Sequence, residues 1–93
     1  MKIQNINGTS DNICSCGSWL NHWKKFSGQT VTSCPVPSCY KTDLVGAHVQ
    51  KANSLDNRWY IYPLCNSHNQ HSGVLDVPIA YRLVSANKSG TCG

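Results

Sequence analysis

Two short cysteine-containing stretches constrain what this chain can fold into. CPVPSC places Cys34 and Cys39 on either side of a proline-containing turn, and PLCNSHN places Cys65 three residues before His68. A turn presents two thiolates on one side, while positions i and i+3 of a helix place two ligands on one face. The sequence therefore predicts a tetrahedral zinc site of three thiolates and one imidazole, closed to chemistry at the ion and so structural.

The size of the chain makes such a site useful for stability. A chain of 93 residues forms one domain with a small core, and a bound metal can supply the stability that the core lacks. Disulfides are the alternative use for its six cysteines. The N-terminal stretch MKIQNINGTSDN has no apolar run typical of a secretory signal, and no segment approaches the roughly 18–20 apolar residues of a membrane span. We therefore expect a cytoplasmic protein without membrane contact, whose thiols are reduced or bind metal.

The remaining cysteines suggest a second zinc site. Cys14 and Cys16 precede Gly17 in another tight turn, His22 follows on a predicted helix, and Cys92 lies near the C-terminus. Together they have the chemistry of a second site of three thiolates and one imidazole. The alternatives are a free Cys92 thiol with a surface His22, or ligands exchanged between the two clusters. A redox role for Cys14 and Cys16 is disfavoured, because thiol oxidoreductases separate their cysteines by two residues.

The pattern along the chain divides it into two parts. Residues 1–12 are polar and Asn-rich, which predicts a flexible N-terminal arm, and residues 13–93 are expected to form a single zinc-binding domain. Within this domain a helix is predicted over residues 19–26, because its apolar side chains fall on one stripe. Ser18 is its expected N-cap and Gly28 its expected end.

The rest of the domain reads as short strands and one short helix. The helix is expected to begin at Leu64 and to stop at Gly73, and a polar loop is expected over residues 50–57. Alternating or β-branched stretches predict strands at residues 30–33, 43–49, 58–63, 74–77 and 81–84. The predicted fold class is thus a small, zinc-stabilised α+β fold.

CPVPSC, GAHV and PLCNSHN, in this order, resemble the treble-clef zinc fold and, within it, the HNH endonucleases of the ββα-metal family. The resemblance covers about residues 34–73. It implies a zinc turn, a β-hairpin and a short helix, to which this chain adds an N-terminal helix and short C-terminal strands.

The resemblance also implies an activity, the metal-dependent hydrolysis of phosphodiester bonds in DNA or RNA. His48 in GAHV matches the general base, and Asn69 falls where the family binds its catalytic ion, commonly Mg²⁺, with Mn²⁺ as a substitute. His48 would deprotonate the attacking water while the ion neutralises charge on the phosphate. The catalytic motif is incomplete, since Ala47 stands where many members have Asp or His. His71 is a further candidate ion ligand.

The charge balance supports an alternative function. The chain carries eight Lys and Arg against four acidic residues, a net charge of +4, which is compatible with a polyanionic partner. Alternation places Tyr60 and Tyr62 on one face of a predicted strand and Trp59 on the other, so that one set can stack on bases. The alternative is therefore a non-catalytic treble-clef zinc module that binds nucleic acid or a protein partner.

Overall fold

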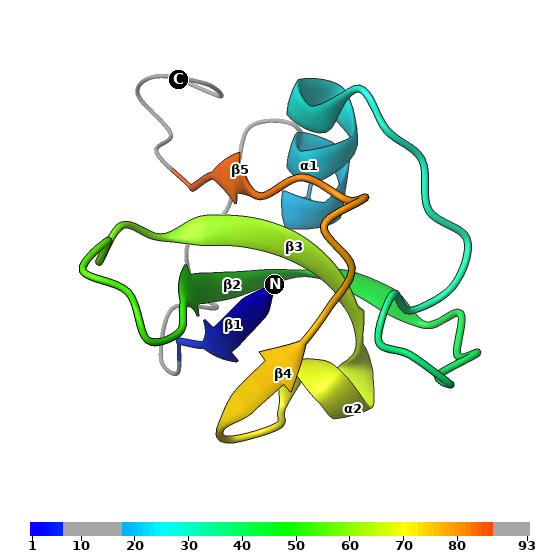
Figure 1. The fold of residues 1–93 in the computed structure, drawn as a ribbon. Coiled ribbons are helices and arrows are strands. Elements are labelled where there is room, and N and C mark those ends of the chain that lie inside the picture. Colours follow the sequence, from blue (N-terminus) through cyan, green and yellow to red (C-terminus); the bar gives the residue numbers. More distant parts are fainter. Residues whose placement is uncertain (7–17, 87–93) are drawn as a thin grey trace.

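A five-stranded antiparallel sheet organises the part of the chain that the structure describes (Figure 1). The computed structural model describes residues 1–6 and 18–86. The strands occur in the spatial order β4-β1-β2-β3-β5. Their bounds are β1 Lys2–Asn5, β2 Leu44–Lys51, β3 Tyr60–Cys65, β4 Val74–Asp76 and β5 Val84–Ser85. With the helices α1 (Trp19–Ser27) and α2 (Asn66–Asn69), they form the small α+β fold that the sequence predicts. Neither of these helices is long and apolar enough to cross a membrane.

The hairpin of β2 and β3 forms the centre of the sheet. Its register runs from Leu44 opposite Cys65 to Val49 opposite Tyr60. The loop between the two strands is held by Asp56, whose carboxylate accepts hydrogen bonds from the Arg58 guanidinium and the Tyr60 hydroxyl. These hydrogen bonds hold the pKa of Asp56 well below its usual range, and the hydrogen bond from the Arg58 side chain has the largest effect.

Helix α1 has the start and the two caps that the sequence predicts, and it ends one residue later than expected, at Ser27. The Ser18 hydroxyl accepts a hydrogen bond from the Asn21 backbone N–H at 3.1 Å. Gly28 ends the helix with a φ of 68°, in the left-handed region that glycine adopts without strain. The buried Trp23 fixes the helix to the C-terminal part of the chain, because its indole N–H donates to the Arg82 carbonyl oxygen at 2.7 Å.

Two apolar clusters lie on the two faces of the sheet, and Figure 1 shows α1 and α2 on opposite sides of the β2–β3 hairpin. On the α1 side, Trp23, Ile61 and Val84 pack together. Gly46 lies directly beneath α1, where an added Cβ would come within 2.4 Å of the Trp19 carbonyl carbon. The cluster on the other face contains Ile3, Cys34, Ala47, Val49, Tyr62, Leu64, Cys65, Leu75 and Val77.

The N-terminus differs from the expected flexible arm. Lys2–Asn5 form strand β1, which pairs with β2 on one side and β4 on the other. Ile3 in this strand is fully buried in the core. A four-residue strand with one buried apolar side chain has too little periodicity to be recognised from sequence. Residues 7–12 of the expected arm lie outside the described residues.

Several predicted elements have different bounds in the structure. The strand predicted at residues 30–33 does not form. Strand β2 continues to Lys51, so the expected loop at residues 50–57 begins at Ala52. Strand β3 extends to Cys65, which leaves only Asn66–Asn69 in a helix that was expected to begin at Leu64. The last predicted strand, residues 81–84, is replaced by Val84–Ser85, which pair with β3. Pairing between strands thus overrides the local pattern.

Candidate metal centre

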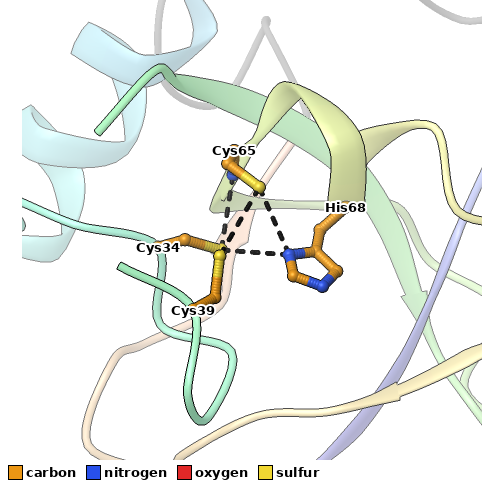
Figure 2. Close-up of side chains that lie close together, drawn as sticks. All are labelled: Cys34, Cys39, Cys65 and His68. Atoms are coloured by element: carbon orange, nitrogen blue, oxygen red, sulfur yellow. Dashed lines mark hydrogen bonds between the residues drawn. The ribbon is translucent and has the colours of Figure 1, made fainter. Parts of the chain in front are cut away.

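The four residues predicted to bind zinc lie together at one corner of the fold. One ligand atom from each of Cys34, Cys39, Cys65 and His68 lies within 4.8 Å of all the others (Figure 2). The Nδ1 atom of His68 is 3.2 Å from Cys65 Sγ and 3.5 Å from Cys34 Sγ. The Sγ atoms of Cys39 and Cys65 are 3.9 Å apart. Ligand atoms around a tetrahedral zinc ion are separated by about 3.5–3.8 Å, so this cluster can hold a metal ion such as zinc.

The turn between Cys34 and Cys39 presents two of the thiols. The Cys34 backbone N–H donates to the Lys41 carbonyl oxygen at 2.8 Å, which closes the base of the turn. The Cys39 backbone N–H donates to the Val36 carbonyl oxygen at 3.0 Å. Ser38 has a φ of 66°, an unusual value for a residue with a side chain, and this conformation brings the chain back towards the start of the turn.

The end of β3 and the start of α2 supply the other two ligands. Cys65 pairs with Leu44 of β2 and is the extended N-cap residue of α2, so it occupies the junction of strand and helix. His68 follows within the single turn of α2. The Cys65 backbone N–H donates to Cys34 Sγ at 3.4 Å, which links the two halves of the corner directly.

The surroundings of the two turn thiols differ. Burial raises the pKa of the Cys34 thiol to about 11. The Lys41 backbone N–H lowers the pKa of Cys39, and the positive charge of Lys41 acts in the same direction. The Lys41 ammonium also donates to Ser67 Oγ at 2.7 Å. Three thiolates with a bound Zn²⁺ would carry one net negative charge, and Lys41 is placed to offset it.

Metal binding at this corner is expected to release protons. Free cysteine has a pKa of about 8.5, so thiols without metal are largely protonated at pH 7, and burial in the folded corner raises the pKa of Cys34 further. Zinc binds the thiolate, so binding should release about two to three protons per ion, and zinc affinity should fall as pH falls. Calorimetric titration with zinc at pH 7, in buffers of different ionisation enthalpy, measures this number. Release of fewer than one proton would contradict thiolate ligation.

Strand β1 holds the C-terminal end of α2 through Asn5. Its side-chain amide donates to the His68 carbonyl oxygen at 2.8 Å and to the His71 carbonyl oxygen at 3.1 Å. The Oδ1 atom of Asn5 is buried without a hydrogen-bond partner among the described residues. The N-terminal strand therefore supports the backbone of a candidate metal ligand, a contact that the sequence did not predict.

An Asn5→Ala substitution is expected to destabilise the fold by about 1 kcal/mol without loss of metal. Two hydrogen bonds are lost, but removal of Oδ1, which has no partner within residues 1–6 and 18–86, returns part of that free energy. Chemical denaturation with parallel zinc analysis measures both effects, and the exposed Gln4→Ala in the same strand serves as the control. An unchanged unfolding midpoint would show that the contact is dispensable.

The residues predicted to be catalytic occupy two different environments. His48 is only 7% exposed, and its ring packs edge-to-face against Trp19 at a centroid distance of 4.7 Å. Alternation along β2 therefore places His48 on the α1 face, whereas Ala47 and Val49 belong to the cluster beside the metal corner. Asn69 is partly buried on α2.

His22, predicted as a ligand of a second zinc site, is fully buried in α1. Its Nε2 atom lies 2.8 Å from the Ser85 carbonyl oxygen, which joins the helix to β5. The alternative that His22 is a helix-surface residue is therefore wrong. The other three predicted ligands, Cys14, Cys16 and Cys92, lie outside the described residues.

Lys41 and Gly46 are further residues that the sequence analysis did not assign to the site or its support. Lys41 stands two positions after Cys39, a spacing that offered a signal for a charge beside the turn. Gly46 precedes Ala47 in GAHV, and nothing in that stretch indicates a helix packed against it. Comparison with protein-family models, curated proteins and solved structures found no match for this chain.

Proposed function

We propose that the corner binds one structural Zn²⁺ and that the chain is a zinc-stabilised module of the treble-clef type. The observation that carries the proposal is the convergence of Cys34, Cys39, Cys65 and His68 from two segments, the turn and the junction of β3 with α2. The order of these segments also supports it, because the turn is followed by the β2–β3 hairpin and then by α2. Soft thiolates with one imidazole are the ligands that zinc prefers in structural sites.

The role of this ion is to hold the fold rather than to catalyse a reaction. Four protein ligands complete a tetrahedron, so no position is left for water or substrate. Cys34 and Cys65 are buried at 4% and 0% exposure, and both belong to the larger apolar cluster. The ion thereby fastens the turn to the central hairpin. Reduced thiols, which the expected cytoplasmic location maintains, are required for this binding.

Within this scheme the chain acts as a non-catalytic module that binds single-stranded nucleic acid. The net charge of +4 favours a polyanionic partner, and Lys24 and Lys25 are exposed together on α1. Trp59 is 44% exposed, whereas Tyr62 is fully buried and the Tyr60 hydroxyl is bound to Asp56. Trp59 is therefore the aromatic side chain of this segment that is available for stacking on a base.

Binding is tested with a fluorescently labelled single-stranded oligonucleotide and zinc-loaded protein. Affinity should fall steeply as salt increases, and Trp59→Ala should weaken it by about 5- to 150-fold, the range for loss of one stacked base. Tyr40→Ala, at a side chain 83% exposed in the turn segment, is the control. Absence of binding at low salt, with one zinc per chain, would reject this partner and leave a protein partner as the remaining proposal.

A nuclease of the HNH type is the competing proposal. It requires His48 as general base together with Mg²⁺ or Mn²⁺ held near Asn69. The burial of His48 against Trp19 argues against it, because a base must reach the attacking water. Plasmid nicking with either ion, abolished by His48→Ala in a protein that keeps its zinc, would establish the nuclease and reject the non-catalytic module.

A further inference from the structure

The four ligands of the corner are not equally protected from solvent. Cys34 and Cys65 are buried at 4% and 0% exposure, whereas Cys39 is only partly buried. Figure 2 shows Cys39 on the turn loop and Cys65 across the cluster at the end of β3. A small oxidant from solvent therefore reaches Cys39 first.

The partner for a second oxidation step is already in place. Cys65 Sγ lies 3.9 Å from Cys39 Sγ, so a modest approach of the loop brings the two sulfur atoms into bonding distance. Cys34 Sγ, by contrast, accepts a hydrogen bond from the Cys65 backbone N–H and lies 3.5 Å from His68 Nδ1. These contacts engage the Cys34 sulfur with the Cys65 backbone and the His68 imidazole, although it also lies within 4.8 Å of the Cys39 sulfur.

We propose that the corner is a peroxide-sensitive switch, in which oxidation joins Cys39 to Cys65 and releases the zinc ion. The inference rests on the proposed zinc binding and adds a mode of regulation to it. Loss of two thiolates leaves zinc with only Cys34 and His68, too few ligands to retain it. The new disulfide still links the turn to the hairpin, so the corner stays closed while the metal leaves.

The reaction balances with hydrogen peroxide as the oxidant. The Cys39 thiolate attacks one peroxide oxygen, the O–O bond breaks, and the departing hydroxide takes up a proton to give water and a sulfenic acid. The Cys65 thiolate then attacks the sulfenic sulfur, the S–S bond forms, and the S–O bond breaks with loss of a second water after protonation. Two thiolates, one peroxide and two protons thus give one disulfide and two waters, and two electrons pass from sulfur to oxygen.

The test uses a full-length variant in which Cys14, Cys16 and Cys92 are replaced by Ser, so that only the three described cysteines remain. Zinc content is measured first, and absence of zinc at this stage rejects the proposed function rather than the switch. Peroxide is then added, and zinc release is followed with a chromogenic chelator. One zinc per chain should be released, and titratable thiols should fall from three to one.

Mass spectrometry of tryptic peptides under non-reducing conditions identifies the disulfide. No Lys or Arg separates Cys34 from Cys39, whereas Lys41 separates both from Cys65. The expected product is therefore two joined peptides, with fragmentation between Cys34 and Cys39 placing the bond at Cys39. A disulfide within the first peptide, a bond at Cys34, or retention of zinc under peroxide would each overturn the proposal.

A matched variant tests whether Cys39 is the point of attack. Cys39→His offers a nitrogen ligand in place of the partly exposed thiol, and zinc release by peroxide should slow at least tenfold. An unchanged rate with bound zinc would contradict attack at Cys39. Should this variant fail to bind zinc, peptide mapping of the parent protein still shows whether the disulfide joins Cys39 to Cys65. Reduction with dithiothreitol in the presence of zinc should restore one bound ion per chain.

Discussion

Replacement of Cys65 by Ser is expected to remove the bound zinc and to unfold the chain. Serine offers a hydroxyl that stays protonated at neutral pH, so the corner loses a thiolate ligand. Cys65 is also fully buried, pairs with Leu44, and donates its backbone N–H to Cys34 Sγ. Its sulfur therefore lies where the strand, the helix and the turn meet.

The magnitude follows from the free energies involved. Binding of a structural zinc ion contributes about 10–16 kcal/mol, while the whole stability of a domain is about 5–15 kcal/mol. Once the ion is lost, the small core of a 93-residue chain therefore leaves little or no net free energy of unfolding. We expect Cys65→Ser to retain less than about a tenth of the zinc and to lose its cooperative thermal transition.

Two further variants provide the controls. His68→Cys should keep zinc, because a fourth thiolate is a common structural ligand. His71→Ala should also keep zinc, since His71 is exposed and lies outside the cluster. Circular dichroism with elemental analysis distinguishes these results. A Cys65→Ser protein that remains folded with its zinc content unchanged would place the metal elsewhere.

Replacement of Gly46 by Ala is expected to displace α1 from the sheet. The added Cβ would lie 2.4 Å from the Trp19 carbonyl carbon and 2.5 Å from the Leu20 backbone nitrogen. Both are backbone atoms at the start of the helix, so relief requires movement of the whole helix rather than of one side chain. Such movement would disturb the packing of Trp23 against the sheet. The expected loss of stability is about 3 kcal/mol, the upper end for an overpacked core.

Gly28→Ala is the matched control for this prediction. Gly28 has a φ of 68°, and no atom lies within 4 Å of an added Cβ. An alanine there would therefore strain the backbone without clashing with a neighbouring atom. The cost should be about 1 kcal/mol. Zinc content should remain unchanged in both variants, because α1 and the metal corner lie on opposite faces of the hairpin. Denaturant unfolding compares them, and a Gly46→Ala protein no less stable than Gly28→Ala would contradict the close packing of α1.

The metal corner could be predicted from the sequence because ligand chemistry leaves few choices. Two closely spaced pairs of potential ligands favour metal binding over other roles in a small chain. These pairs are Cys34 with Cys39, at the ends of a turn, and Cys65 with His68. Helix α1 was predictable for a different reason, since its cap at Ser18 and its end at Gly28 are local signals. Both predictions depend on residues close to one another in sequence.

The rest of the fold depends on contacts that local sequence does not record. Strand β1 forms because β2 and β4 pair with it, not because its own pattern is strong. Helix α2 begins late because β2 pairs with Cys65 and keeps it extended. Alternation shows that His48 and Ala47 face opposite ways, but it cannot show which face α1 covers. The burial of His48 against Trp19 could therefore not be predicted from the sequence.

Zinc stoichiometry tests the central claim most directly. The variant with Cys14→Ser, Cys16→Ser and Cys92→Ser, purified without chelator, carries only the described ligands. Elemental analysis should find one zinc per chain, and a strong chelator should remove the ion and the fold together. A protein that contains no zinc, or that keeps its fold after the ion is removed, would contradict a metal-dependent structure.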